Sequence, residues 1–206
     1  QVQADTFEPL VPSVQWQLLG CGLDLVKYGY CDRPEESLAW VGRISPEKGL
    51  EDAINAAIAA GQPLQIFGQI EDADYWKRLQ PLIEQSNSRI KHCGFLPTEL
   101  LQKLLGRTRA LLVTPHWVEA FGIVAIEALA CGVPVIDYDQ GGPAENVRHG
   151  KTGWLVEPGN LEELVSAIAK IDQIDRLACR QQAEANYSLE AWGRRFERWF
   201  YKAMVL

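Results

Sequence analysis

The sequence lacks any run of about 20 apolar residues, the length that a helix needs to cross a bilayer. Its N-terminal stretch also lacks the basic start and the apolar run of a signal peptide. Basic residues are outnumbered, with 20 Lys and Arg against 27 Asp and Glu and a formal charge of −7. Because binding to nucleic-acid phosphates requires clustered Lys and Arg, this balance argues against a nucleic-acid partner and leaves a small molecule open.

Several site motifs are absent as well. The five cysteines are an odd number, are widely spaced and form no C-x-x-C, so neither a disulfide framework nor a zinc site is indicated and a reducing compartment fits best. No pair of the three histidines has metal-ligand spacing, and we expect no metal. The phosphate loop G-x-x-x-x-G-K-[ST] and the dinucleotide motif G-x-G-x-x-G are also missing, so kinases and dehydrogenases lose their main support.

What is present is an alternating pattern of short apolar runs and amphipathic stretches that begins at Leu38. The pattern predicts an α/β fold, with a Rossmann-like parallel sheet and helices on both of its faces. The predicted strands are 38–41, 64–67, 90–93, 110–114, 133–137 and 154–156; the predicted helices between them are 50–60, 72–85, 98–105, 122–130 and 144–148. Ligands of such folds bind beyond the carboxyl ends of the strands, so the strand-to-helix loops are the place to search.

The two ends of the chain differ from this central part. Residues 1–37 are interrupted by Pro and Gly and are interpreted as a linker or hinge, which leaves 38–188 as the ligand-binding domain. The tail is helical at 161–171, 174–185 and 189–204. Its last segment, 189–206, carries an aromatic stripe at helical spacing that indicates packing against this domain or another: Trp192, Phe196, Trp199 and Phe200.

The loop after the first predicted strand carries two cations five positions apart. Arg43 and Lys48 lie between Gly42 and Gly49, directly before a helix. Two cations beside a helix N-terminus make a plausible diphosphate clamp. Solvated loop charges are the alternative, and the spacing alone does not decide between them.

The loop after the fourth predicted strand carries two acids and a helix start. Glu127 lies in a nearly all-apolar helix, so it points into an interior or a cleft, where it needs a partner such as a pair of ligand hydroxyls or a structural salt bridge. Glu119 precedes the helix and could reach the same ligand or be a solvated loop acid. The amides of Phe121, Gly122 and Ile123 begin the helix and can donate to an anion or a sugar hydroxyl.

Two further features near these loops leave their roles open. Gly141 and Gly142 follow the fifth predicted strand and permit either a close approach to a ligand or a tight turn. His116 lies in the suspected site loop, whereas His92 and His149 are interpreted as structural or surface residues.

Taken in order, these loops resemble the large retaining glycosyltransferase family 4, which has the two-Rossmann-domain architecture called GT-B. Residues 19–24 look like the family's N-G-V-D hinge element, with Cys21 in place of Asn, and 42–49 match its G-R-x-x-x-x-K-G loop. Glu119 and Glu127 match its E-x7-E motif. The segments 128–135, 141–145 and 152–156 continue the pattern in order.

The resemblance implies a role for each matching residue. Arg43 and Lys48 would bind the donor diphosphate, Glu127 the ribose, and Glu119 with the amides that begin the helix the hexose. The implied catalytic residues are Arg43, Lys48 and Glu119, and the implied donor-binding residues are Gly42, Arg43, Lys48, Cys93, Gly94, Phe95, Glu119, Phe121, Gly122, Ile123, Val124 and Glu127. The donor would be a nucleoside diphosphate sugar, by default a UDP-hexose such as UDP-glucose, transferred with retention and without a metal or another cofactor.

The resemblance also implies a partner domain. In the family an acceptor-binding domain precedes the hinge element, and the last helix crosses back to it. We therefore expect this chain to bind the donor but not to transfer sugar alone, and the implied location is cytoplasmic, with peripheral membrane association through the other half. The alternatives are half of a nucleotide-sugar epimerase, a hydrolase that uses Glu119 and Glu127 as acid and base, and a non-catalytic nucleotide-sugar-binding module.

Overall fold

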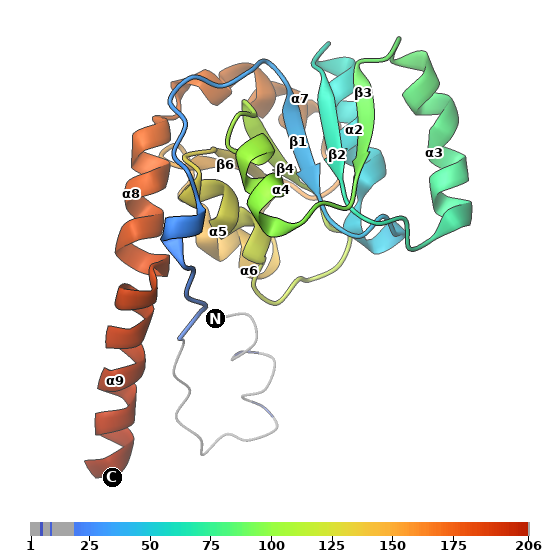
Figure 1. Cartoon of the computed structure of the whole chain (residues 1–206). Helices are drawn as coiled ribbons and strands as arrows, with labels where there is room; N and C mark the ends of the chain where they lie inside the picture. The colour runs from blue at the N-terminus through green and yellow to red at the C-terminus, as the bar shows by residue number, and fades with distance from the viewer. Residues whose placement is uncertain (1–4, 6–8, 10–18, 206) are drawn as a thin grey trace.

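The computed structural model describes residues 5, 9 and 19–205 of the chain, so the predicted linker is seen only in part. Its centre is one parallel sheet with the strand order β3-β2-β1-β4-β5-β6 (Figure 1). The strands are β1 (Leu38–Val41), β2 (Leu64–Phe67), β3 (Ile90–Gly94), β4 (Ala110–Val113), β5 (Val135–Tyr138) and β6 (Gly153–Val156). Every residue of β4 and β5 is buried, as expected for strands that are covered on both faces.

Helices cover both faces of this sheet (Figure 1). One group packs α2 (Leu50–Ala59) against α3 (Ala73–Gln85) and α7 (Leu161–Lys170), while the other packs α5 (Ile123–Ala130) against α4 (Thr98–Leu105), α6 (Gly141–Asn146) and α8 (Arg176–Tyr187). Short 3-10 helices, η1 (Leu25–Lys27), η2 (Pro46–Lys48) and η3 (Ile171–Gln173), join these elements. The predicted α/β fold with a Rossmann-like parallel sheet is therefore confirmed.

The last helix, α9 (Leu189–Val205), leaves this body and extends past the carboxyl edge of the sheet (Figure 1). Its start is anchored, because Leu23 pairs with Ser188 and the Trp192 indole donates a hydrogen bond to the Gly20 carbonyl at 3.1 Å. Along the predicted stripe, Trp192, Phe196 and Trp199 follow one another with ring centroids 5.6 and 5.5 Å apart. Phe196, Trp199 and Phe200 are exposed beyond this anchor. The described part of the chain contains no helix with the length and apolar character required to span a membrane.

One predicted helix was misplaced. The sequence pattern predicts it at 144–148, because two adjacent glycines are typical of a loop, whereas α6 is Gly141–Asn146. A side chain at Gly142 would put its Cβ 2.1 Å from the Ala120 carbonyl oxygen. The glycines are therefore needed inside the helix, where close contact with the neighbouring loop outweighs their low helix propensity. The fifth strand is also shifted, to 135–138 instead of 133–137.

Candidate functional site

Three loops at the carboxyl edge of the sheet are held together by hydrogen bonds. The loop after β1 is bound by the loop after β4, because the Thr114 hydroxyl donates to the Gly49 carbonyl at 2.8 Å and the His116 amide donates to the Glu47 carbonyl at 2.9 Å. The third loop, after β5, leads into α6, whose Gly142 amide joins them by donating to the Glu119 carbonyl at 2.6 Å. The predicted site residues on these loops are thus held on one framework.

Gly49 makes the first of these contacts possible. Its φ of 65° is left-handed, and a Cβ at this position would lie 1.7 Å from the Thr114 carbonyl oxygen. Only glycine meets both conditions. This residue lets the loop that carries Arg43 and Lys48 pack directly against the end of β4.

Lys48 and Glu119 form an ion pair where these loops meet. The Lys48 Nζ lies 2.9 Å from a Glu119 carboxylate oxygen, and the two side chains are only 17% and 22% exposed. The Lys48 ammonium also lies 5.2 Å from the centroid of the Trp117 ring. The structure therefore brings together two of the three residues that were predicted to be catalytic.

Arg43 lies on the same loop but faces different partners. Its guanidinium bonds to Glu71 and lies 3.8 Å from Glu47, and its side chain is 55% exposed. The bond to Glu71 is the main cause of its raised pKa, and the charge of Glu119 contributes a smaller part. Arg43 is thus an exposed cation that would have to exchange Glu71 for a ligand phosphate.

The start of α5 offers unoccupied donors beside this pair. Gly122 caps the helix with a left-handed φ of 75°, and the Asn146 side chain donates to the Phe121 carbonyl at 2.5 Å. Within the described part of the chain, the amides of Phe121, Gly122, Ile123 and Val124 make no hydrogen bond. Free amides and the positive end of the helix dipole make this terminus suited to an anion or to sugar hydroxyls.

Glu127 lies on the second turn of α5 and has a partner that the sequence did not reveal. The Tyr28 hydroxyl donates to its Oε1 at 2.8 Å. Burial raises the pKa of Glu127, and the hydrogen bond from Tyr28 lowers it again in part. Among the described residues no cation lies within salt-bridge distance, so the structural salt bridge that was one alternative is not found there.

Asp137 is a fully buried acid near this edge that was not among the predicted site residues. It lies on β5 with no exposed surface, and neither carboxylate oxygen has a hydrogen-bond partner among the described residues. Burial, followed by the charge of Glu119, raises its pKa well above the ordinary value; the adjacent Tyr138 amide offsets part of this without reaching hydrogen-bond geometry. An acid at the end of an otherwise apolar strand was the signal that could have identified it.

The histidines are engaged in structural contacts. A ring nitrogen of His116 lies 2.7 Å from an Asp52 oxygen that also accepts from the Tyr138 hydroxyl at 2.5 Å, so His116 ties its loop to α2. His92 lies 2.9 Å from the Gly68 carbonyl and 4.9 Å from the Trp76 ring, while His149 accepts from the Leu155 amide at 3.2 Å. The structural interpretation of the last two agrees with these contacts.

The predicted base-binding segment lies at the end of β3. Gly94 has a left-handed φ of 76° and its carbonyl accepts from the Gly68 amide at 2.9 Å, which fixes the strand end. Cys93 is half-buried, and burial raises the pKa of its thiol. The Phe95 ring is exposed at the same edge and offers a flat apolar surface.

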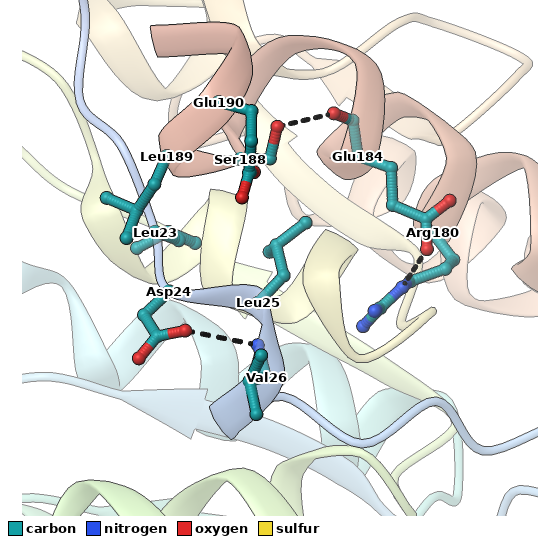
Figure 2. A pocket seen from close by; sticks show the side chains of 9 residues that line it. All are labelled: Leu23, Asp24, Leu25, Val26, Arg180, Glu184, Ser188, Leu189 and Glu190. Atoms are coloured by element: carbon teal, nitrogen blue, oxygen red, sulfur yellow. Dashed lines mark hydrogen bonds and ion pairs between the residues drawn. The ribbon is translucent and has the colours of Figure 1, made fainter. Parts of the chain in front are cut away.

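A separate pocket of about 360 Å³ lies between η1 and the junction of α8 with α9 (Figure 2). Its walls combine apolar and charged side chains, and it includes none of the predicted site residues. The lining residues are Leu23, Asp24, Leu25, Val26, Arg180, Glu184, Ser188, Leu189 and Glu190.

Comparison with known families identifies the family of this chain. The family described as glycosyl transferases group 1 matches residues 32–186, which include all three loops. The chain belongs to the group 1 glycosyltransferase family. The predicted transferase class is confirmed at this level.

Curated relatives of this group 1 glycosyltransferase domain agree with the assignment. It is 35% identical to the D-inositol 3-phosphate glycosyltransferase of Rhodococcus erythropolis over 82% of this chain and 44% of that protein. It is 31% identical to the glycogen synthase of Mycobacterium tuberculosis over 80% of this chain and 41% of that protein. The chain thus spans less than half the length of these relatives.

Solved structures show the same architecture. Sucrose-phosphate synthase from Thermosynechococcus elongatus superposes with a TM-score of 0.83 at 25% identity, covering 100% of this chain and 57% of that one. HepE from Anabaena, solved in complex with UDP and glucose, superposes with a TM-score of 0.78 at 22% identity, covering 88% and 55%. The second likeness shows the fold alone, and both support the GT-B-like fold.

Proposed function

We propose that this chain is the donor-binding domain of a retaining family 4 glycosyltransferase that transfers a hexose from a UDP-sugar. The observation that carries the proposal is the partly buried Lys48–Glu119 pair beside the unoccupied amides of α5. A cation, a carboxylate and free amides on one framework match the chemistry of a sugar diphosphate. The UDP and glucose in the HepE crystals support a donor of this class.

Each of these groups would bind a different part of the donor. Lys48 binds the diphosphate, and Arg43 joins it by releasing Glu71. Glu119, freed in part from Lys48, accepts hydrogen bonds from the hexose hydroxyls, while the amides of Phe121 to Val124 donate to its oxygens. Glu127 accepts from the ribose, and Cys93, Gly94 and Phe95 flank the base.

The same arrangement would also promote the transfer reaction. In glycosyl transfer the bond between the anomeric carbon and the diphosphate oxygen breaks, and the departing diphosphate gains negative charge as the sugar gains oxocarbenium character. A cation held in a partly buried site stabilises this developing charge more than the ground state, and only that difference accelerates the reaction. No metal or other cofactor is required in this proposal.

None of the roles proposed for these loops involves the acceptor or its binding domain. Because the chain covers less than half of its curated relatives, we propose that a second domain supplies the acceptor site and that α9 contributes to its contact with this one. Its exposed aromatic stripe beyond the carboxyl edge is the surface available for that contact. The isolated chain is therefore expected to bind the donor without transferring sugar.

Calorimetry with UDP and with uridine tests the proposal. Lys48→Ala should weaken UDP binding about 10- to 100-fold, the range for a hydrogen bond to a charged group, and leave uridine binding unchanged. Arg109→Ala is the matched control, because Arg109 is also 17% exposed and ion-paired, with Asp172, but precedes β4 at the opposite edge of the sheet. Equal losses for both ligands, or equal effects of the two variants, would overturn the diphosphate assignment.

A second measurement separates transfer from mere binding. The chain is joined to the acceptor-binding half of a group 1 relative, and the anomeric proton of the product is followed by NMR. Product with the donor's anomeric configuration supports a retaining transferase. Donor binding without turnover would instead identify a non-catalytic nucleotide-sugar-binding module.

A further inference from the structure

Tyr28 is the residue through which the segment before the sheet contacts the proposed ribose site. It lies directly after η1, is 6% exposed, and donates its hydroxyl proton to Glu127 on α5, 99 positions further along the chain. Burial and the nearby Glu127 charge raise the pKa of Tyr28, so the hydroxyl stays protonated and remains a donor. The bond is therefore a fixed link between this segment and α5.

One guanidinium holds both ends of this link. Arg180 Nη1 donates to the Tyr28 carbonyl at 2.7 Å and to the Ala130 carbonyl, at the last residue of α5, at 2.6 Å. The same side chain is braced by Glu184, to which its Nε donates at 2.7 Å (Figure 2). The backbone of Tyr28 and the end of the helix that carries Glu127 cannot separate without breaking these bonds.

The link affects Glu127 in two ways. It uses Oε1 and leaves the other oxygen without a hydrogen bond within the described part of the chain. It also opposes the effect of burial, which by itself favours the neutral acid. A neutral Glu127 would have lost acceptor capacity, whereas an ionised one accepts strongly from ligand hydroxyls.

We propose that Tyr28 is a positioning residue for the donor's ribose, fixing the orientation of the Glu127 carboxylate and keeping its free oxygen able to accept from a ribose hydroxyl. The inference rests on the proposed function, in which Glu127 binds the ribose. It assigns a positioning role to a residue outside the three site loops. It also distinguishes the hydroxyl of Tyr28 from its ring, because a phenylalanine would fill the same space.

The test is calorimetry with UDP and 2′-deoxy-UDP on the wild type, Tyr28→Phe and Glu127→Gln, with melting temperatures recorded without ligand. Tyr28→Phe should weaken UDP binding about tenfold, the effect of one hydrogen bond to a charged group, and leave 2′-deoxy-UDP binding nearly unchanged. Tyr75→Phe is the control, since Tyr75 is similarly buried and its hydroxyl accepts from the Glu51 amide, away from the proposed site. A purely structural role would weaken both nucleotides equally.

The outcomes separate this inference from the function on which it rests. If the wild type prefers UDP and Glu127→Gln abolishes the preference while Tyr28→Phe retains it, the role of Tyr28 is wrong and the ribose site stands. If the wild type and Glu127→Gln bind both nucleotides alike, the ribose assignment itself fails. Loss of the preference in both variants, with no loss in Tyr75→Phe, supports the inference.

Discussion

The arginine that begins α8 and the cations in the loops at the carboxyl edge have different kinds of partner. Arg176 donates to three backbone carbonyls, those of Cys31, Gly106 and Thr108, at 2.7 to 3.0 Å. Lys48 and Arg43 instead face carboxylates. A carbonyl partner is fixed by the fold, whereas a cation paired with a carboxylate can exchange that carboxylate for a ligand anion. The loop cations, which also lie at the carboxyl edge of the sheet, are therefore suited to bind a substrate.

The largest effect on stability is expected from Arg176→Ala. The change leaves buried carbonyls without donors, which should lower the free energy of unfolding by about 3 kcal/mol. Urea denaturation measures this. Arg109→Ala should cost less than about 1 kcal/mol, since its partner Asp172 is 72% exposed. If the two variants lose the same stability, the structural role of Arg176 is contradicted.

Asp137→Asn is expected to increase the free energy of unfolding, by less than Arg176→Ala decreases it. The folded-state pKa of Asp137 lies above that of the unfolded chain, so this carboxyl contributes stability in acid that is lost as the pH rises through the raised pKa. The Asp137→Asn variant has no ionisable group at this position, so it does not lose stability in this way as the pH rises. It should be about 1–3 kcal/mol more stable than the wild type at pH 7 and nearly equal to it near pH 4.

Thermal unfolding across this pH range checks the prediction. Glu119 and Asp139 also raise the pKa of Asp137, so Glu119→Gln is a useful second variant that should reduce the pH dependence. Parallel stability profiles for the wild type and Asp137→Asn would show that the Asp137 carboxyl is already compensated.

The smallest effect is expected on α9. Phe200→Ser should change the stability of this chain by no more than about 0.5 kcal/mol, because the ring is half exposed beyond the anchored part of the helix. Trp192→Ser should cost at least about 1 kcal/mol more, since the indole bonds to Gly20 and packs against Gly22. Equal losses on thermal unfolding would mean that the whole stripe packs on this domain.

Much of the fold could be predicted because its signals are local. Short apolar runs separated by amphipathic stretches placed β1, β2 and β4 within one residue of their bounds. The predicted start of α6 was wrong because glycine has a low intrinsic helix propensity. The contact that requires Gly142 is made with a loop about 20 positions away, which local propensity does not include. The division of the chain into linker, domain and final helix stays a prediction.

The candidate site was predictable only where it follows the strand ends. Lys48 and Glu119 lie in such loops, and the parallel sheet brings these loops to one edge. The partners of Glu127 and His116 were not predictable, because they come from distant parts of the chain. Tyr28 reaches Glu127 across 99 positions, and Asp52 links His116 to Tyr138 through side chains on three separate elements.

The most direct test of the central claim is an NMR titration of the backbone amides with UDP-glucose. The proposed site predicts that the signals of Phe121, Gly122, Ile123 and Val124 shift on saturation, together with those near Lys48. Signals near Arg109, at the opposite edge of the sheet, should stay in place. Shifts confined to the pocket between η1 and the α8–α9 junction, with the α5 amides unchanged, would contradict the account.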